Sequence, residues 1–144
     1  MTTQSTYSER MPKATPGLIA GSDYNTATGV NEDAVALAFG VPVHQGVEDN
    51  GVKKAGVLAN FRGVTVRDIT LGAEKDAYPQ YANVGLLNRG QIWVRPSVAV
   101  TPTDPVHYNG TTGDWLITGQ QGPIVGAKWR TSAGPGEDAL LELT

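Results

Sequence analysis

The side chains best suited to chemistry in this sequence are its two histidines, His44 and His107. An imidazole can bind a metal ion or transfer a proton near neutral pH. Zinc sites, however, need a second ligand at a short spacing such as H-x3–5-H or HExxH. These histidines stand far apart, each directly after a valine in an expected strand. We therefore expect both to be half-buried, hydrogen-bonded packing residues, and we expect no metal site.

The acidic residues that could form a catalytic pair are mostly neighbours in the chain. Adjacent residues of a strand point to opposite faces, so these pairs do not form a dyad locally. Loop acids such as Asp76, Asp104 and Asp114 could meet only through the tertiary fold. A small hydrolase built from loop acids is thus one rival, and it requires a concave pocket with perturbed carboxyl groups. The adjacent pairs are Glu32-Asp33, Glu48-Asp49 and Glu137-Asp138.

Signatures of nucleophiles and nucleotide sites are missing as well. The sequence contains no G-x-S-x-G elbow, P-loop or dinucleotide fingerprint. The two glycines of 110-GTTGD-114 predict a turn, because no helix follows whose N-terminus could hold a phosphate. The absence of cysteine excludes a thiolate nucleophile, a disulfide framework and a cysteine-based zinc site. We predict no enzymatic activity and no cofactor.

Charge and hydropathy argue against two further classes of partner. The formal net charge is -3, and no basic run is longer than Lys53-Lys54, so we expect no nucleic-acid-binding surface. No run of about 18 apolar residues occurs that could span a membrane. The N-terminus also lacks the apolar stretch of a signal peptide. We expect a protein that is made in the cytoplasm and not exported.

Short strands and turns are the elements expected to position these residues. The 144 residues include 18 glycines and 9 prolines, a composition typical of many strands and turns. Alternating bulky and small residues over 35–43 predict a strand; an Ala-rich helix capped by Asn31 is the rival interpretation. A change of apolar phase within 62–71 predicts a bulge near Arg67-Asp68.

A hairpin is predicted within 45–58. Asn50-Gly51 is the dipeptide that suits both centres of a type I′ turn. Counting outward from this turn pairs Glu48 with Lys53, which carry opposite charges.

About nine such strands predict one all-β domain over residues 34–144, an antiparallel sandwich or barrel. Residues 1–33 are rich in Thr, Ser, Asn and Gly and cannot bury enough apolar surface to fold alone. We expect them to form an extended N-terminal arm, which is either frayed or ordered against a partner.

Trp93 is the side chain that breaks the pattern. In 89-RGQIWVRPSVAV-100 the even positions are apolar, so Trp93 and Arg95 lie on the polar face, whereas Trp115 and Trp129 share their phase with core residues. Trp beside Arg is typical of protein-protein hot spots, and it would also suit a sugar-binding platform with Tyr78 and Tyr81. The other explanation is that the arm or a loop of the same chain covers Trp93. The candidate interface comprises Tyr7, Leu18, Ile19, Tyr24, Trp93 and Arg95.

An ordered series of segments resembles the structural cement, or head decoration, proteins of tailed bacteriophages. The resemblance covers nearly everything after Pro16 and rests on strand and turn motifs. These are 17-GLIAGSD-23, 38-AFGVPVHQG-46, 61-FRGVTVRDITL-71, 81-YANVGLLNRGQIWV-94, 105-PVHY-108 and 124-IVGAKWRTSAGPGEDALLEL-143.

This resemblance implies a non-enzymatic virion protein with an all-β, often jelly-roll-like fold. Such a protein binds outside the shell formed by the phage major capsid protein and clamps neighbouring capsomers together. It has no catalytic residues, and homo-oligomerisation as a dimer or trimer is expected. A carbohydrate-binding β-sandwich module is the alternative function.

Overall fold

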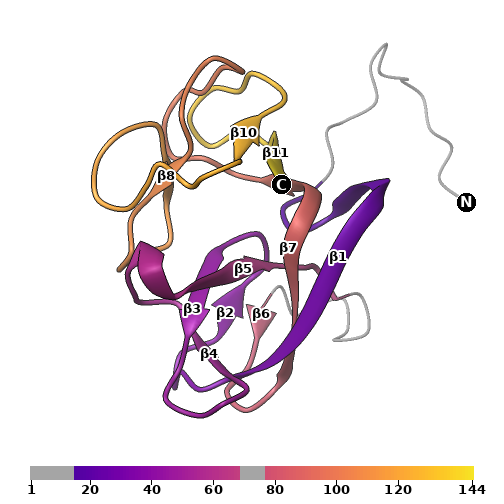
Figure 1. Ribbon diagram of the computed structural model, residues 1–144, viewed down its shortest axis with the longest axis vertical. Coiled ribbons are helices and arrows are strands. Elements are labelled where there is room, and N and C mark those ends of the chain that lie inside the picture. The colour runs from indigo at the N-terminus through magenta and orange to yellow at the C-terminus, as the bar shows by residue number, and fades with distance from the viewer. Residues whose placement is uncertain (1–14, 69–76) are drawn as a thin grey trace, which may run out of the picture.

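The computed structural model describes residues 15–68 and 77–144, and within these ranges the protein is built from strands and loops (Figure 1). The all-β prediction is confirmed. One 3-10 turn, η1 (Leu58–Asn60), precedes β5, and no helix of the described ranges could cross a membrane. The strands are β1 (Ile19–Asn31), β2 (Leu37–Ala38), β3 (Pro42–Gln45), β4 (Gly51–Lys53), β5 (Phe61–Thr65), β6 (Ala77–Tyr78), β7 (Asn83–Val94), β8 (His107–Tyr108), β9 (Trp115–Leu116), β10 (Lys128–Trp129) and β11 (Ala139–Leu143).

The main sheet closes into a small barrel. Its strand order is β1-β4-β3-β5-β7-β11-β10, and β1 also pairs with β7, which joins the ring β1-β4-β3-β5-β7. The β1–β4 pair is parallel and the other pairs are antiparallel, so the sheet is mixed and not purely antiparallel. Beyond the barrel, β11 and β10 continue the sheet from the second half of β7.

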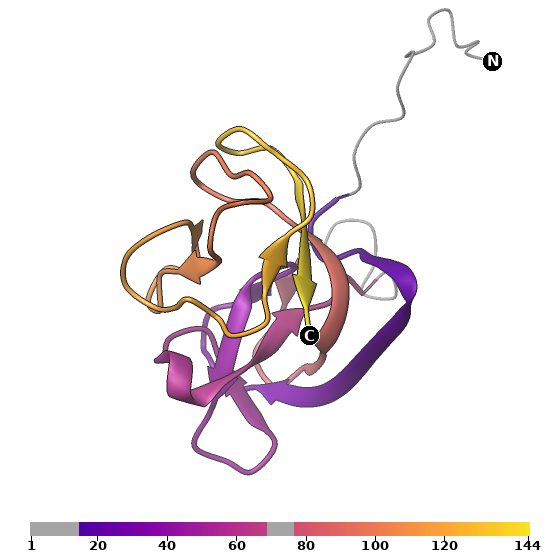
Figure 2. The same cartoon turned by 45° about the horizontal axis from the view of Figure 1, so that its top comes forward.

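Strand β7 carries two hydrophobic cores because its buried face changes along its length. Leu86 packs inside the barrel with Val43, Val52 and Tyr78, while Leu87 belongs to the second core, and both leucines are fully buried. The second core lies under the loops after β7, which form the orange and yellow part of Figure 2.

The two tryptophans predicted to be core residues are confirmed as such. The rings of Trp115 and Trp129 meet edge to face with their centroids 6.4 Å apart, and each side chain is 1% exposed. Trp115 Nε1 donates to the carbonyl oxygen of Gly40 at 2.8 Å, so this ring also joins the second core to the barrel.

The strand predicted over 35–43 is interrupted. Leu37, Phe39 and Val43 are buried as the alternation predicted, but a turn at Phe39-Gly40 separates β2 from β3, and Val35 is 71% exposed. Gly40 adopts a φ of +74°, a left-handed conformation that favours glycine. The rival helix does not form.

The predicted hairpin forms with a different register. Gln45 faces Val52 and His44 faces Lys53, so Glu48 lies in the turn and does not pair with Lys53. The Glu32 carboxylate supports this geometry, because it accepts hydrogen bonds from the backbone N–H groups of Val47 at 2.7 Å and of Glu48 at 2.9 Å.

Two other predictions lie near the limits of the described chain. Strand β5 ends at Thr65, and the second half of the predicted bulged strand, from residue 69, lies outside the described residues. Residues 19–31 of the expected arm form β1 and contribute to the barrel wall. The division into an arm, 1–33, and a domain, 34–144, stays a prediction.

Candidate interaction surface

The two histidines do not share a site. His44 on β3 is fully buried: its Nδ1 lies 2.8 Å from the carbonyl oxygen of Lys54 and its Nε2 lies 2.8 Å from the hydroxyl of Tyr108. Burial lowers the pKa of His44 and raises the pKa of Tyr108 to about 12. His107 lies instead near the surface, with Nδ1 3.2 Å from the carbonyl oxygen of Gly119. The hydrogen bond between the uncharged side chains of His44 and Tyr108 thus links the barrel to β8.

The acidic residues that are neighbours in the chain bind different partners. Glu32 holds the turn after β3, the Asp33 carboxylate accepts from the Lys54 backbone N–H at 2.9 Å, and Asp138 pairs with Arg95. Glu48 and Asp49 are exposed on the turn. Within the described ranges, no group of three His, Asp or Glu side chains is arranged to hold a metal ion.

Trp93 lies on the face of β7 opposite to Ile92 and Val94, which are fully buried. The start of the described chain runs directly along its backbone: Gly17 N–H donates to the Trp93 carbonyl oxygen at 2.8 Å, and Trp93 N–H donates to that of Leu18 at 2.9 Å. The Trp93 side chain remains partly exposed. The segment that begins at Gly17 therefore supports this strand without covering the ring completely.

The structure brings several predicted interface residues together beside Trp93. Leu18, 36% exposed, precedes Ile19, which pairs with Ile92 on β7 and packs against the second core. Arg95 Nε lies 3.1 Å from Asp138 Oδ1, and its side chain is 54% exposed. We call Leu18, Ile19, Trp93 and Arg95 the Trp93 edge. Tyr7, another residue of the candidate interface, lies outside the described residues.

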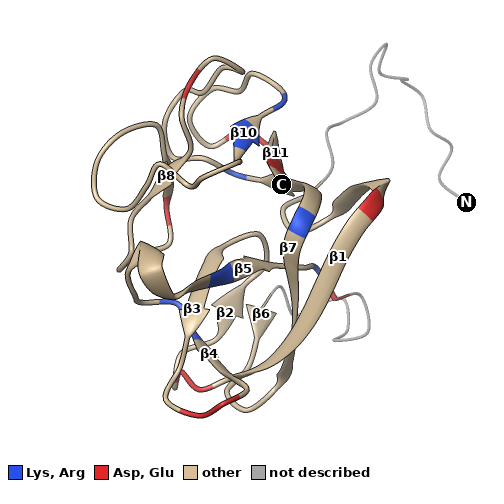
Figure 3. Cartoon of the chain, viewed as in Figure 1, with Lys and Arg blue, Asp and Glu red and all other residues tan. Residues whose placement is uncertain are grey.

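Tyr24 lies away from the Trp93 edge, on a wide bulge of β1. Residues 21–24 separate the pair Ala20–Gln91 from the pair Asn25–Arg89, so they face Gly90 alone. Gly90 has a φ of +122°, and a Cβ there would lie 2.6 Å from the Cβ of Tyr24. Asp23 of β1 and Arg89 of β7 form an ion pair at this corner, and Figure 3 shows acidic and basic segments of these strands in red and blue.

An open hollow of about 480 Å³ lies beside this bulge. Its walls come from the bulge itself, from β7 and from the C-terminal end of β11. Asn25 Nδ2 donates to Asn88 Oδ1 at 2.7 Å, and Arg89 pairs with Asp23 at 3.2 Å, so the polar groups of this corner are largely matched among themselves.

At the other end of the barrel, the sequence analysis missed the exposed Val47 and considered Tyr81 only as part of a sugar-binding platform. Val47, 89% exposed, and Tyr81, 75% exposed, lie in turns near a hollow of about 460 Å³ around Asn50. Tyr81 is the non-glycine residue of the described ranges with a left-handed φ, +66°. The available signal was a bulky apolar residue inside each polar turn.

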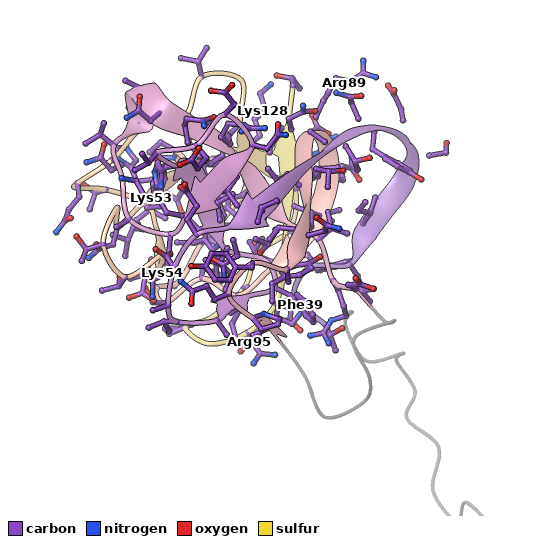
Figure 4. The ribbon with its side chains drawn as sticks, turned by 90° about the horizontal axis from the view of Figure 1, so that it is seen from below. Phe39, Lys53, Lys54, Arg89, Arg95 and Lys128 are labelled. Carbon is purple, nitrogen blue, oxygen red and sulfur yellow. The ribbon has the colours of Figure 1, made fainter. Side chains whose placement is uncertain are left out.

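Among the described residues, the lysines and arginines labelled in Figure 4 do not gather on one face. Figure 4 shows the labelled lysines and arginines at separate places around the outline of the molecule. Tyr78 is 1% exposed and meets Phe39 edge to face at 5.2 Å, so it cannot form a sugar-binding platform with Trp93 and Tyr81. The exposed features are scattered apolar and mixed polar patches, which suit contacts with protein.

Comparison with known proteins gives one family and several structures of similar fold. The family model described as structural cement protein (E217 gp24/Pam3 gp6) matches residues 3–144. No match was found among curated proteins. A chain from the capsid of Myoviridae phage XM1 is similar with a TM-score of 0.73 at 15% identity, covering 100% of this chain and 98% of that chain. The head fiber gp8.5 N base of bacteriophage phi29 is similar with a TM-score of 0.56 at 12% identity, covering 85% of this chain and 95% of that one.

Proposed function

Because the chain belongs to the family of phage structural cement proteins, we propose that it binds the outer surface of an icosahedral phage head and staples neighbouring major capsid protein subunits. The family match over residues 3–144 carries this proposal. Membership gives the protein a structural, capsid-associated and stabilising role. The resemblance of the fold to a chain from a phage capsid supports the same role.

The proposed mechanism is multivalent attachment. Each contact can be modest, because a copy that remains bound through one contact presents the others at high effective concentration. Scattered exposed side chains on opposite ends of the barrel, such as Tyr24 and Tyr81, fit a protein that touches more than one neighbour. A stable contact of the usual kind buries about 1,600 Å² in total, and its strength depends on a few anchors.

The Trp93 edge is our candidate for one such anchor. It combines a partly exposed Trp and an Arg with the exposed Leu18 at the point where the chain enters the described structure. Aromatic and Arg side chains offer large contact area and directed hydrogen bonds. We extend this candidate contact along the chain to Tyr7 in residues 1–14, because Gly17 lies beside Trp93. We assign Tyr24 to a separate candidate contact on the β1 bulge.

The proposed function is non-enzymatic. The described loop acids of the rival hydrolase bind neighbouring groups: Asp104 accepts from the Thr101 backbone N–H at 2.9 Å, and Asp114 accepts from the Thr112 hydroxyl at 2.9 Å. Asp76 lies outside the described residues. The carbohydrate-binding alternative loses Tyr78 from its platform, because that ring is buried.

A particle-binding assay tests the proposal. Phage heads that lack this protein are incubated with the purified chain, and the bound fraction is measured after sedimentation, together with the temperature at which the heads break. Saturable binding with a raised breakage temperature supports stapling. Binding of polysaccharide in place of heads would support the alternative.

A further inference from the structure

Strand β1 has an open outer edge along its middle. On its inner side β1 pairs with β7 from Thr26 to Val30 without a register shift. On its outer side it pairs with β4 only at Val30 and Asn31. Figures 1 and 2 both show β1 at the outside of the barrel, with no coloured ribbon beyond its middle. Among the described residues, nothing pairs with this edge between Gly21 and Thr28.

The hydrogen bonds at the end of β1 show which backbone groups face outward. Val30 N–H donates to the carbonyl oxygen of Asn50, on the outer side, whereas Asn31 N–H donates to Ala82, on the inner side. Backbone groups alternate between the two sides of a strand. The N–H and C=O groups of Thr26 and Thr28 therefore point outward, with no backbone partner in the described chain.

This edge lacks the usual protection against strand pairing. Natural edge strands are short, or carry charges, prolines or bulges that prevent another strand from joining. The bulge with Asp23 protects the first half of β1, but Tyr24 to Val30 contain no charge and no proline. The other open edge of the sheet, β10, has only two residues and contains Lys128.

We propose that β1 pairs through this edge with β1 of a second copy, as an antiparallel pair around a twofold axis through Ala27. In this register Thr26 faces Thr28 of the partner subunit, and Thr28 faces Thr26 of the partner subunit. Both outward residues of each copy then form hydrogen-bonded pairs, with about four inter-strand hydrogen bonds in total. Ala27 meets its own counterpart as a non-hydrogen-bonded pair, the closer type of pair.

The space beside the outer edge of β1 favours β1 of a second copy over a long strand of another protein. Asn50 occupies the outer side of β1 next to Val30, so an added strand must leave the ladder just beyond Thr28. In the twofold register, Asn25 of the partner subunit lies opposite the position just beyond Thr28. Strand β1 has its own register shift at Asn25, where it already departs from regular pairing. A straight strand from another protein would meet Asn50.

Charge and area also fit a self-pairing contact. The strip from Tyr24 to Val30 is uncharged, so a twofold contact brings no like charges together. A ladder this short buries less than the roughly 1,000 Å² expected of a stable interface. The contact is therefore transient between free copies, where a disulfide can still trap it, and becomes persistent when copies are held close together. It rests on the proposed function for that proximity, which a decorated shell would supply.

A single cysteine tests the proposal, since the native chain has none. The Ala27→Cys variant is oxidised in free solution and the disulfide-linked dimer is measured on a non-reducing gel. Val125→Cys is the matched control, because Val125 is 92% exposed and lies in a turn distant from β1 in the sequence. We expect the Ala27→Cys chain to form the dimer faster than the control. Equal rates, or no dimer from Ala27→Cys, would overturn the proposal.

A second variant shows whether backbone pairing drives the cross-link. Thr28→Pro removes an outward N–H from each copy and leaves the β7 ladder intact. Added to Ala27→Cys, it should slow dimer formation by about thirtyfold, the equivalent of one backbone hydrogen bond lost per copy. If this double variant melts early, Thr28→Lys replaces it, since Thr28 is exposed.

An unchanged rate in a folded edge variant would contradict pairing through β1. These measurements use no phage heads, so a failure here leaves the particle-binding result untouched. Conversely, a failure to bind phage heads would not change the conclusion from the cross-linking experiment.

Discussion

The imidazole of His44 and the hydroxyl of Tyr108 lie 2.8 Å apart in the interior, between the barrel and the loops of the second core. The Nδ1 atom of His44 lies 2.8 Å from a carbonyl oxygen and must carry a proton, so Nε2 of the neutral ring accepts from Tyr108. Because desolvation keeps the ring neutral, this pair makes the fold sensitive to acid.

Stability is therefore predicted to fall as the pH is lowered through the range just below 6.5. The folded-state pKa of His44 lies below the ordinary value of 6.5, so the unfolded chain binds a proton before the folded chain does. The stabilisation is complete above pH 6.5 and is lost as the pH falls toward the folded pKa. Melting temperatures measured across this range check the slope. His44→Gln should flatten it, whereas His107→Gln should not.

Tyr108→Phe is predicted to destabilise the protein by about 1–3 kcal/mol, because it leaves the buried Nε2 of His44 without a donor. The matched control is Tyr24→Phe, which removes the same atom from a ring that is 46% exposed. Urea unfolding followed by tryptophan fluorescence measures both. Equal effects of the two changes would contradict a structural role for the pair.

Gly90→Ala is predicted to lower the free energy of unfolding by about 2–3 kcal/mol, through a disfavoured φ and a close approach to Tyr24. Gly21→Ala separates these causes: its φ is +78°, but a Cβ there meets nothing within 4 Å. It should cost about 1 kcal/mol. If the two variants unfold alike, the Tyr24 contact contributes nothing.

Part of this architecture was predictable because burial follows local alternation. The phase of Ile92 and Val94 against Trp93, and the burial of Trp115 and Trp129, follow from the period of two. The hairpin register was not predictable from Asn50-Gly51 alone, since the turn is also bound by the Glu32 carboxylate, which is distant in the sequence. The continuous strand predicted over 35–43 does not form, because the chain turns at Gly40. The carbonyl oxygen of this glycine accepts a hydrogen bond from the Trp115 N–H.

The candidate site was less predictable than the fold. The polar composition of residues 1–33 predicts an arm, yet residues 19–31 form β1. These residues are ordered by pairing with β7 and not by burial of their own apolar surface. The clustering of Leu18 with Trp93 depends on that long-range pairing. Tyr81 and Val47 carry one weak local signal, a bulky apolar residue inside a polar turn.

Trp93→Ala is predicted to reduce the occupancy of phage heads with little change in melting temperature, because its ring is partly exposed and lies outside both cores. Val57→Ala is a control on a half-exposed side chain away from the Trp93 edge. Quantitative sedimentation with heads measures occupancy. A large thermal loss would assign Trp93 to structural support of Gly17 and Leu18.

Removal of residues 1–14 is predicted to leave the barrel folded, since the contacts of Pro16 and Gly17 with Arg67 and Trp93 are retained. Occupancy of heads should fall if this segment contributes a contact. The melting temperature and the bound fraction are measured on the same preparation. Undiminished occupancy would remove residues 1–14 from the account of attachment.

The most direct test of the account is the mechanical effect on the particle itself. Heads without this protein are compared with heads saturated by it, and the temperature of DNA release or shell rupture is recorded for each. The account predicts saturable binding and a higher rupture temperature for the saturated heads. Heads that bind no protein, or that rupture at the same temperature when fully occupied, would contradict a stapling function.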